Sequence, residues 1–238
     1  MQGIWAVVPV KDGTAAKGRL AGVLDQRERR GLFHAMLEDV LSCLSRVDGL
    51  SGTIVVTRDA RASALARSIG ARVIREARND GQSAAVRSAA AVLGAEGATA
   101  LLTVPGDVPL IAAGEIEAVM DAHGPGPSVT LVPARDGGGT NCLVCSPPDA
   151  FEPAFGTDSF ARHRAAAQRL GITPEVVLLS GLGLDVDTPG DLEALLARPL
   201  SGNTGAYLDA SGIAARLGSR RAAHPAGVRE KHVGVGSP

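Results

Sequence analysis

Three aspartates near the ends of apolar segments are the residues best suited to chemistry in this sequence. Asp107 follows the run LLTV within PGDVP, while Asp185 and Asp187 close the run LGLDVD. We expect residues 183–187 to form a strand, so the side chains of Asp185 and Asp187 would point to the same face of a sheet. Burying one carboxylate is costly and two close together repel each other, so this arrangement requires a positive partner.

A divalent cation could supply that positive charge. Mg²⁺ prefers oxygen ligands and is usually held by one or two carboxylates together with substrate phosphates and water. Ligands of open α/β sheets bind beyond the carboxyl ends of the strands, where all three aspartates are expected. An Asp-x-Asp pair on one strand and a lone aspartate on another are a reasonable partial ligand set.

Each aspartate also has a structural interpretation. Asp107 could simply start a turn after its strand. Asp187 could cap the following helix, but the segment TPGD assigns that task to Thr188 at the N-cap, with a proline at N1 and Asp191 at N3. That assignment leaves Asp185 and Asp187 without a structural task, which favours a metal or phosphate site.

A loop with three cations follows the first expected strand, residues 4–10. The segment PVKDGTAAKGRLAG carries Lys11, Lys17 and Arg19 among small residues that let backbone approach a ligand. It has neither the spacing of a Walker A loop nor that of a G-x-G-x-x-G dinucleotide loop. A cationic loop after the first strand still suits a nucleoside triphosphate, with a solvated loop as the alternative.

A second candidate anion site combines GGGTN (137–141) with FGTDSFARH (155–163). Gly156 and Ser159 precede or open a helix whose free N–H groups favour an anion, and Thr140 opens the facing strand. Ordinary N-capping explains the same residues, and the two roles are compatible. The five histidines lack spaced partners, so we expect none of them to bind metal or to act in catalysis.

Alternating strand and helix patterns place these motifs on one α/β sheet. Strands are expected at 4–10, 52–57, 71–76, 98–104, 128–134, 140–146, 175–179 and 183–187, and helices from about 25 and then at 59–70, 81–94, 113–122, 158–170 and 189–197. This order predicts a mostly parallel sheet with helices on both faces, and the strand pair around 137–139 adds an antiparallel element. The segment DQRE predicts a capping box, with Asp25 at the N-cap and Glu28 at N3.

Composition narrows the class of protein further. A formal net charge of −1 and 3% aromatic residues argue against nucleic acid as a partner, and no apolar run is long enough to span a membrane. Cys142 and Cys145 lie in a strand-like segment that would direct their thiols to opposite faces, so we expect buried, reduced cysteines and a cytoplasmic protein. We expect one domain over 1–198, followed by a Gly, Ala and Arg-rich tail (199–238) that is largely disordered apart from a short helix at 209–217.

In chain order, the motifs VPVK, AKGRL, PGDVPLI, GGGTN, FGTDSFARH and LGLDVDTPGDL resemble the phosphoenolpyruvate or 2-phospho-L-lactate guanylyltransferases of coenzyme F420 biosynthesis. The resemblance covers about residues 4–197 and implies a Rossmann-like, glycosyltransferase-A-like nucleotidyltransferase of three layers that uses GTP and Mg²⁺. It assigns Asp107, Asp185 and Asp187 to two metal ions, and it assigns Lys17, together with Lys11 or Arg19, to the triphosphate. It assigns Thr140, Gly156 and Ser159 to phosphoenolpyruvate. Gly81 and Ser83 match the loop that faces the nucleotide base. That loop usually reads Gly-Leu-Asn in the family and is Gly-Gln-Ser here, a departure that bears on guanine preference.

The resemblance also implies a reaction, in which a substrate phosphate oxygen attacks the α-phosphorus of GTP and pyrophosphate leaves. A phosphate with a second pKa of about 6 is largely ionised at neutral pH, so no general base is required. The acceptor could be phosphoenolpyruvate, 2-phospho-L-lactate or 3-phospho-D-glycerate. The alternatives are a nucleotidyltransferase of the molybdenum-cofactor or sugar-nucleotide type and a catalytically inactive nucleotide-binding protein. We expect the positive partner of the aspartates to be Mg²⁺ brought in with GTP, not a lysine or arginine of the chain.

Overall fold

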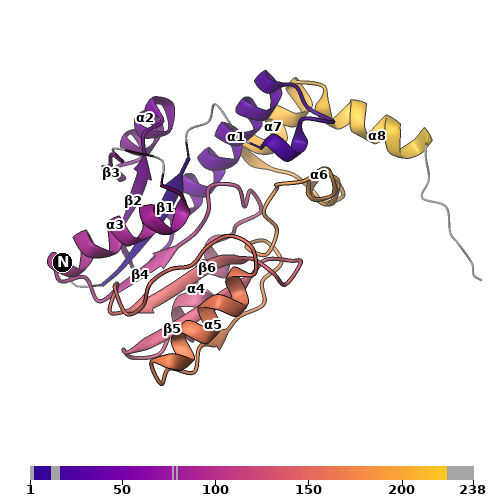
Figure 1. Cartoon of the computed structure of the whole chain (residues 1–238). Helices are drawn as coiled ribbons and strands as arrows, with labels where there is room; N and C mark the ends of the chain where they lie inside the picture. The colour runs from indigo at the N-terminus through magenta and orange to yellow at the C-terminus, as the bar shows by residue number, and fades with distance from the viewer. Residues whose placement is uncertain (1–2, 12–16, 77, 79, 224–238) are drawn as a thin grey trace, which may run out of the picture.

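The structure is a computed structural model that describes residues 3–11, 17–76, 78 and 80–223. Within these residues, seven strands form one sheet in the order β3-β2-β1-β4-β6-β5-β7 (Figure 1). The strands are β1 (Ile4–Val10), β2 (Leu50–Thr57), β3 (Arg72–Ile74), β4 (Ala100–Thr103), β5 (Ser128–Pro133), β6 (Thr140–Ser146) and β7 (Glu175–Val176). The helices are α1 (Gln26–Leu44), α2 (Ala60–Ser68), α3 (Gln82–Ala95), α4 (Ala113–Ala122), α5 (Ser159–Arg169), α6 (Pro189–Leu196), α7 (Gly202–Ala210) and α8 (Ile213–Ala223), with a 3-10 turn, η2, at Gly18–Leu20.

The sheet is mostly parallel and contains the expected antiparallel element. Strand β1 runs parallel to β2 and β4, β2 runs parallel to β3, and β5 runs parallel to β7. Strand β6 is antiparallel to both of its neighbours, β4 and β5. Because β1 and β4 are adjacent and parallel, the segments that leave their carboxyl ends emerge at the same edge of the sheet.

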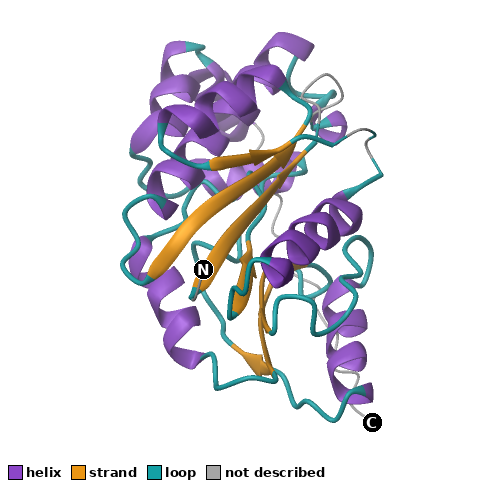
Figure 2. Ribbon diagram, turned by 90° about the vertical axis from the view of Figure 1, so that its left-hand side faces the viewer, coloured by secondary structure: helices purple, strands orange, loops and turns teal. Residues whose placement is uncertain are grey.

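Helices cover both faces of the sheet, which gives three layers (Figure 2). Alternate strand residues face opposite ways, so Ala6 and Val8 of β1 pack in a cluster with residues of α1, α2 and α4. Trp5 and Val7 belong to the opposite cluster, which contains residues of α3 and α5. Among the helices that the structure describes, none is long and apolar enough to cross a membrane.

Two of the cysteines confirm the alternation expected for their strand. Cys142 belongs to the cluster on the first face and Cys145 to the cluster on the second face. Burial raises the pKa of both thiols, that of Cys145 to about 12, so both stay protonated and unreactive at neutral pH. These residues serve the hydrophobic core.

Helices α1 and α6 begin at the expected capping boxes. Asp25 accepts a hydrogen bond from the Glu28 N–H (2.7 Å), and Glu28 accepts one from the Asp25 N–H (2.9 Å). At α6 the Thr188 hydroxyl accepts from the Asp191 N–H (3.3 Å), while Asp191 accepts from the Thr188 N–H (2.9 Å). These local assignments hold because both partners of a capping box lie three residues apart in sequence.

The expectation of a tail that is largely disordered apart from a helix at 209–217 is wrong for residues 202–223. They form α7, which packs against α1, and then α8, which extends away from it (Figure 1). The α1 residue Asp39 accepts hydrogen bonds from the N–H groups of Asn203 (2.7 Å) and Thr204 (2.8 Å), and so caps α7. Leu208 and Ile213 are buried in a cluster with residues of α1 and α6. A tail of low overall hydrophobicity folds here because its few apolar residues find a partner surface. Residues 224–238 of the predicted tail lie outside the described residues.

Candidate functional site

Two adjoining cavities open where the chain leaves the carboxyl ends of β1 and β4. The first, of about 300 Å³, and the second, of about 580 Å³, share five lining residues. The shared residues are Lys11, Gln82, Pro105, Asp107 and Asp187. Two ligands placed in these cavities would therefore meet at a boundary that carries one cation and two carboxylates.

Residues 183–187 do not form the strand that we expected from the apolar alternation of LGLDVD; they run as an irregular segment. Hydrogen bonds from two other elements hold this segment in place. The Val186 N–H donates to the Asp107 carbonyl oxygen (3.0 Å), and Glu115 of α4 accepts from the N–H groups of Gly181 (2.7 Å) and Leu182 (2.9 Å). The bond from Val186 brings its two flanking aspartates next to Asp107 without strand pairing.

Two glycines let this segment fold tightly. A Cβ atom on Gly181 would collide with the Leu110 carbonyl oxygen and with the Glu115 carboxylate that accepts the segment's N–H groups. A Cβ atom on Gly183 would lie 2.5 Å from the Leu179 carbonyl oxygen, closer than real Cβ contacts come. The spacing of GLGLDVD therefore serves close backbone approach, which a β-strand would not require.

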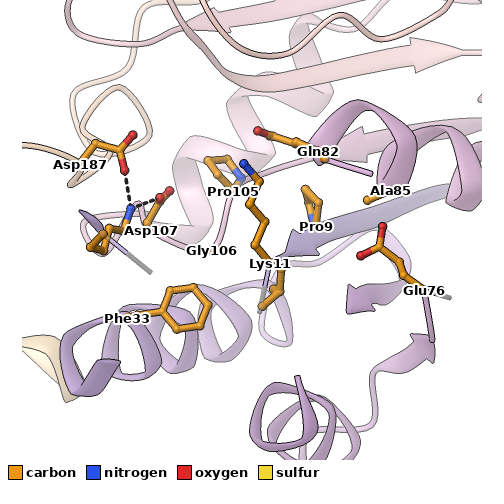
Figure 3. Close-up of a pocket in the computed structure, with 13 residues that line it drawn as sticks. Pro9, Lys11, Phe33, Glu76, Gln82, Ala85, Pro105, Gly106, Asp107 and Asp187 are labelled. Atoms are coloured by element: carbon orange, nitrogen blue, oxygen red, sulfur yellow. Dashed lines mark hydrogen bonds and ion pairs between the residues drawn. The ribbon is translucent and has the colours of Figure 1, made fainter. Parts of the chain in front are cut away.

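Lys17 is the positive partner of two of the aspartates, which corrects our expectation that no lysine of the chain would fill that role. Its ammonium nitrogen pairs with Asp107 Oδ2 and with Asp187 Oδ1, the latter at 2.7 Å (Figure 3, dashed lines). Burial by itself would lower the pKa of Lys17, but the charges of Asp107 and Asp187 outweigh it and raise the pKa. The buried ammonium therefore remains charged.

Asp185 lies beside this ion pair with less compensation. Burial raises its pKa from 3.8 to about 6, and the negative charges of Asp107 and Asp187 act in the same direction. The Asn141 amide opposes them, because it donates to Asp185 Oδ1 (3.1 Å) while also donating to the Leu182 carbonyl oxygen (2.9 Å). Three carboxylates thus share one ammonium, and burial together with the excess negative charge raises the pKa of the aspartate that Lys17 does not contact.

The residues present fit a magnesium ion by their chemistry. In the described part of the chain, no three His, Cys, Asp or Glu side chains form a ready-made metal cluster, since Lys17 lies between two of the aspartates. Asp107 Oδ1 is nonetheless buried and has no hydrogen-bond partner among the described residues. An unsatisfied buried carboxylate oxygen beside two further carboxylates is a donor set that a hard cation prefers.

The second cavity brings together the three residues that we predicted to bind the acid substrate. Thr140 lies at the start of β6, Gly156 in the loop before α5, and Ser159 at the first residue of α5, and all three line this cavity. Two arginines, Arg19 of η2 and Arg135 of the turn after β5, line it as well. Its walls therefore offer hydroxyl and guanidinium groups to an anion, whereas the N–H groups of Ser159 and Phe160 at the start of α5 already donate to the carbonyl oxygens of Gly156 and Gly138.

His163 determines how the Thr140 hydroxyl can act. The His163 Nε2 atom accepts a hydrogen bond from the Ala154 N–H (2.9 Å), so a neutral ring carries its proton on Nδ1, which lies 2.9 Å from Thr140 Oγ1. Burial lowers the pKa of His163 to about 4, which keeps the ring neutral. Thr140 Oγ1 also accepts from the Ser159 hydroxyl (3.4 Å), so its own proton is free to be donated to a ligand.

The remaining residues predicted to bind nucleotide divide between the two cavities. Lys11 lines both, Gly81 lines the first, and Arg19 lines the second. The Ser83 hydroxyl instead accepts a hydrogen bond from the Phe155 N–H (2.9 Å), which ties α3 to the loop before α5. We therefore assign Ser83 to positioning of the loop before α5. Ser83 lines neither cavity, whereas its neighbour Gln82 lines both.

Sequence reasoning missed Asn141, Glu115 and the positioning role of His163. Asn141 lies within the GGGTN motif, and its position there could have indicated a role in the site. A buried amide next to a proposed anion site needs hydrogen-bond partners of its own. Glu115 and His163 carry no local signal. The partners of Glu115 lie 66 and 67 residues away, and the Thr140 partner of His163 lies 23 residues away, so only the fold brings them together.

Comparison with known sequences identifies the family. The family described as guanylyl transferase, CofC-like, matches residues 4–223. A phosphoenolpyruvate guanylyltransferase of Conexibacter woesei is 39% identical over 192 residues, covering 80% of this chain and 86% of the relative. A 3-phospho-D-glycerate guanylyltransferase of Phenylobacterium zucineum is 36% identical over 208 residues, covering 85% of this chain and 94% of the relative.

Solved structures share the fold at low sequence identity. A protein described as a nucleotide-diphospho-sugar transferase, from Desulfovibrio desulfuricans, superposes with a TM-score of 0.73 at 17% identity, covering 91% of this chain and 98% of that one. A cytidylyltransferase from Leptospira borgpetersenii gives a TM-score of 0.55 at 14% identity, with 92% and 95% covered. Because the family match extends from β1 through α8, the chain belongs to the CofC-like guanylyl transferases and is a nucleotidyltransferase of Rossmann-like fold.

Proposed function

We propose that the protein transfers GMP from GTP to the phosphate of a phosphorylated three-carbon acid, with release of pyrophosphate, as a step in coenzyme F420 biosynthesis. Phosphoenolpyruvate is the acceptor we favour, and 2-phospho-L-lactate and 3-phospho-D-glycerate are the other candidates. The names of the relatives support both a guanylyl donor and an acceptor of this class. The observation that carries the proposal is the pair of adjoining cavities that meet at Lys11, Asp107 and Asp187.

The proposed chemistry requires two polyanions to be held together in line. The first cavity would take GTP, with Lys11 and Lys17 neutralising the triphosphate. The second cavity would take the phospho-acid on Thr140, Gly156 and Ser159. A phosphate oxygen of the acid would then attack the α-phosphorus of GTP, and the bond from that phosphorus to the bridging oxygen of pyrophosphate would break.

Asp107, Asp185 and Asp187 would hold Mg²⁺ in this proposal. When bound, Mg²⁺ would neutralise charge on the phosphates and orient the attacking and leaving oxygens. The chain itself needs no general base, because the attacking phosphate, with a second pKa of about 6, is already largely ionised at neutral pH. Asn141 would hold the Asp185 carboxylate towards the metal, and His163 would leave the Thr140 proton directed at the acid.

A substrate screen tests the proposal directly. Four nucleoside triphosphates would each be combined with phosphoenolpyruvate, 2-phospho-L-lactate and 3-phospho-D-glycerate in the presence of Mg²⁺. Pyrophosphate release would be followed continuously, and the guanylylated acid would be identified by mass spectrometry. We expect product with GTP and phosphoenolpyruvate, and the absence of product from every pair would refute the proposal.

A further inference from the structure

The first cavity contains a carboxylate that the proposed phosphoryl chemistry does not use. Glu76 follows β3 and lines this cavity together with Pro9 and Ala85. Its side chain is half-buried, and no described residue forms a hydrogen bond or ion pair with it. Burial and the negative charge of Asp80 raise its pKa, with Arg58 acting against them. A partly desolvated carboxylate without a partner is costly unless a ligand satisfies it.

The cavity has two chemically different ends. Figure 3 shows the carboxylate of Glu76 at the end opposite to Asp107 and Asp187, with Pro9 and Lys11 between them. Lys11 and Lys17 line the part of the cavity next to Asp107 and Asp187 and suit the triphosphate, so the nucleoside would extend towards Glu76. The apolar surfaces of Pro9 and Ala85 lie beside the Glu76 carboxylate (Figure 3) and suit the faces of a flat base.

Guanine is the base whose hydrogen-bonding edge matches a carboxylate. Its N1–H and its 2-amino group are adjacent donors, and an ionised carboxylate offers two acceptor oxygens at a matching spacing. Adenine and cytosine each present a ring-nitrogen acceptor beside one amino group, and uracil presents one N–H between two carbonyl oxygens. A carboxylate would face a lone pair on each of these three bases, which costs binding energy.

We propose that Glu76 is the residue that selects guanine, by accepting hydrogen bonds from N1–H and the 2-amino group of GTP. This inference rests on the proposed function, because it names the donor-selecting residue of the same site. It also accounts for guanine selection in a chain whose Gly-Gln-Ser loop departs from Gly-Leu-Asn. Ser83 of that loop is engaged with the Phe155 N–H and is not needed for the base.

The test compares Glu76→Gln with the unaltered protein on GTP and on inosine triphosphate, which lacks only the 2-amino group. Loss of one hydrogen bond to a charged acceptor should make inosine triphosphate worse than GTP in kcat/KM by about 10- to 100-fold in the unaltered protein. In Glu76→Gln we expect that preference to shrink to within about threefold, because the amide offers a single acceptor oxygen. Turnover of inosine triphosphate by the variant would show that it is folded.

Two controls separate the alternatives. Glu175→Gln makes the same change on the exposed strand β7, and the preference for GTP should be unchanged. The ratio of GTP to 2′-deoxy-GTP should be the same with and without Glu76→Gln, and a change in that ratio alone would overturn the proposal by assigning Glu76 to the ribose. An unaltered preference for GTP over inosine triphosphate in an active Glu76→Gln variant would also overturn it. Absence of transfer by the unaltered protein would instead refute the proposed function.

Discussion

Replacing Asp185 by asparagine should make the metal-free protein more stable while removing its activity. The pKa of Asp185 is raised from 3.8 to about 6, so folding disfavours its charged form. A tenfold change in proton affinity is worth about 1.4 kcal/mol, so this difference corresponds to a cost of about 3 kcal/mol at neutral pH. Asparagine has nearly the same shape, carries no charge, and keeps an oxygen to accept from Asn141.

The sign of the effect sets its pH dependence. At about pH 4 the aspartate is protonated in the folded protein and partly protonated in the unfolded protein, so most of the variant's advantage should be gone. As the pH rises through about 6, the folded-state pKa of Asp185, this buried carboxyl ionises in the unaltered protein and folding stability is lost. The stability advantage of Asp185→Asn should then reach its full value. Because Asp185 is partly exposed, we expect an advantage of about 1 to 3 kcal/mol rather than the full figure.

Urea unfolding in the presence of a chelator measures this advantage, at about pH 7 and about pH 4. Asp121→Asn, at an exposed position of α4, serves as the matched control and should leave stability unchanged. In the pyrophosphate assay Asp185→Asn should lose orders of magnitude in turnover with GTP and phosphoenolpyruvate. The reasoning fails if the variant is no more stable at neutral pH, or if its advantage at the acid pH is as large as at neutral pH. Near-normal turnover would refute the metal assignment separately.

Three further predictions concern positioning, pairing and the C-terminal helices. His163→Leu should raise the KM for the phospho-acid about 3- to 10-fold, the value of one misdirected hydrogen bond, and leave the KM for GTP unchanged in steady-state assays. Lys17→Met should lower the unfolding free energy of the metal-free protein by about 2 kcal/mol, because Asp107 and Asp187 lose their cation, and added Mg²⁺ should restore part of the loss in thermal denaturation. Asp39→Ala should cost about 1 to 2 kcal/mol in urea unfolding by uncapping α7, while activity per folded molecule stays the same.

Local signals in the sequence were sufficient for much of the fold. Strand β1, helix α4 and strand β6 have the expected bounds, because continuous apolar runs and helical spacing are set by neighbours in sequence. The capping boxes at Asp25 and Thr188 depend on residues three apart and were confirmed. The gathering of Asp107, Asp185 and Asp187 followed from where strands end, although the segment that carries two of them is not a strand.

The errors arose where contacts distant in sequence decide the structure. LGLDVD has the alternation of a strand, but the Val186 N–H donates to the Asp107 carbonyl oxygen, and Glu115, 66 residues from Gly181, fixes the two residues that precede the expected strand. Helix α7 could not be predicted from its own segment, because the residue that caps it, Asp39, lies 164 residues before Asn203. Periodicity within one segment contains no information about such partners, so the sequence could not have predicted either outcome.

The position of Lys17 shows why the metal argument from sequence was incomplete. The charges at the expected strand ends required a positive partner, and our expectation that no lysine would fill this role was wrong for Asp107 and Asp187. In the folded chain three carboxylates gather around one ammonium, which satisfies Asp107 Oδ2 and Asp187 Oδ1 but leaves Asp107 Oδ1 unpartnered and the pKa of Asp185 raised. Lys17 therefore does not replace the proposed metal ion. Lys17 lets the three aspartates fold together without a ligand, and the negative charge that it leaves unneutralised would attract Mg²⁺ when the nucleotide binds.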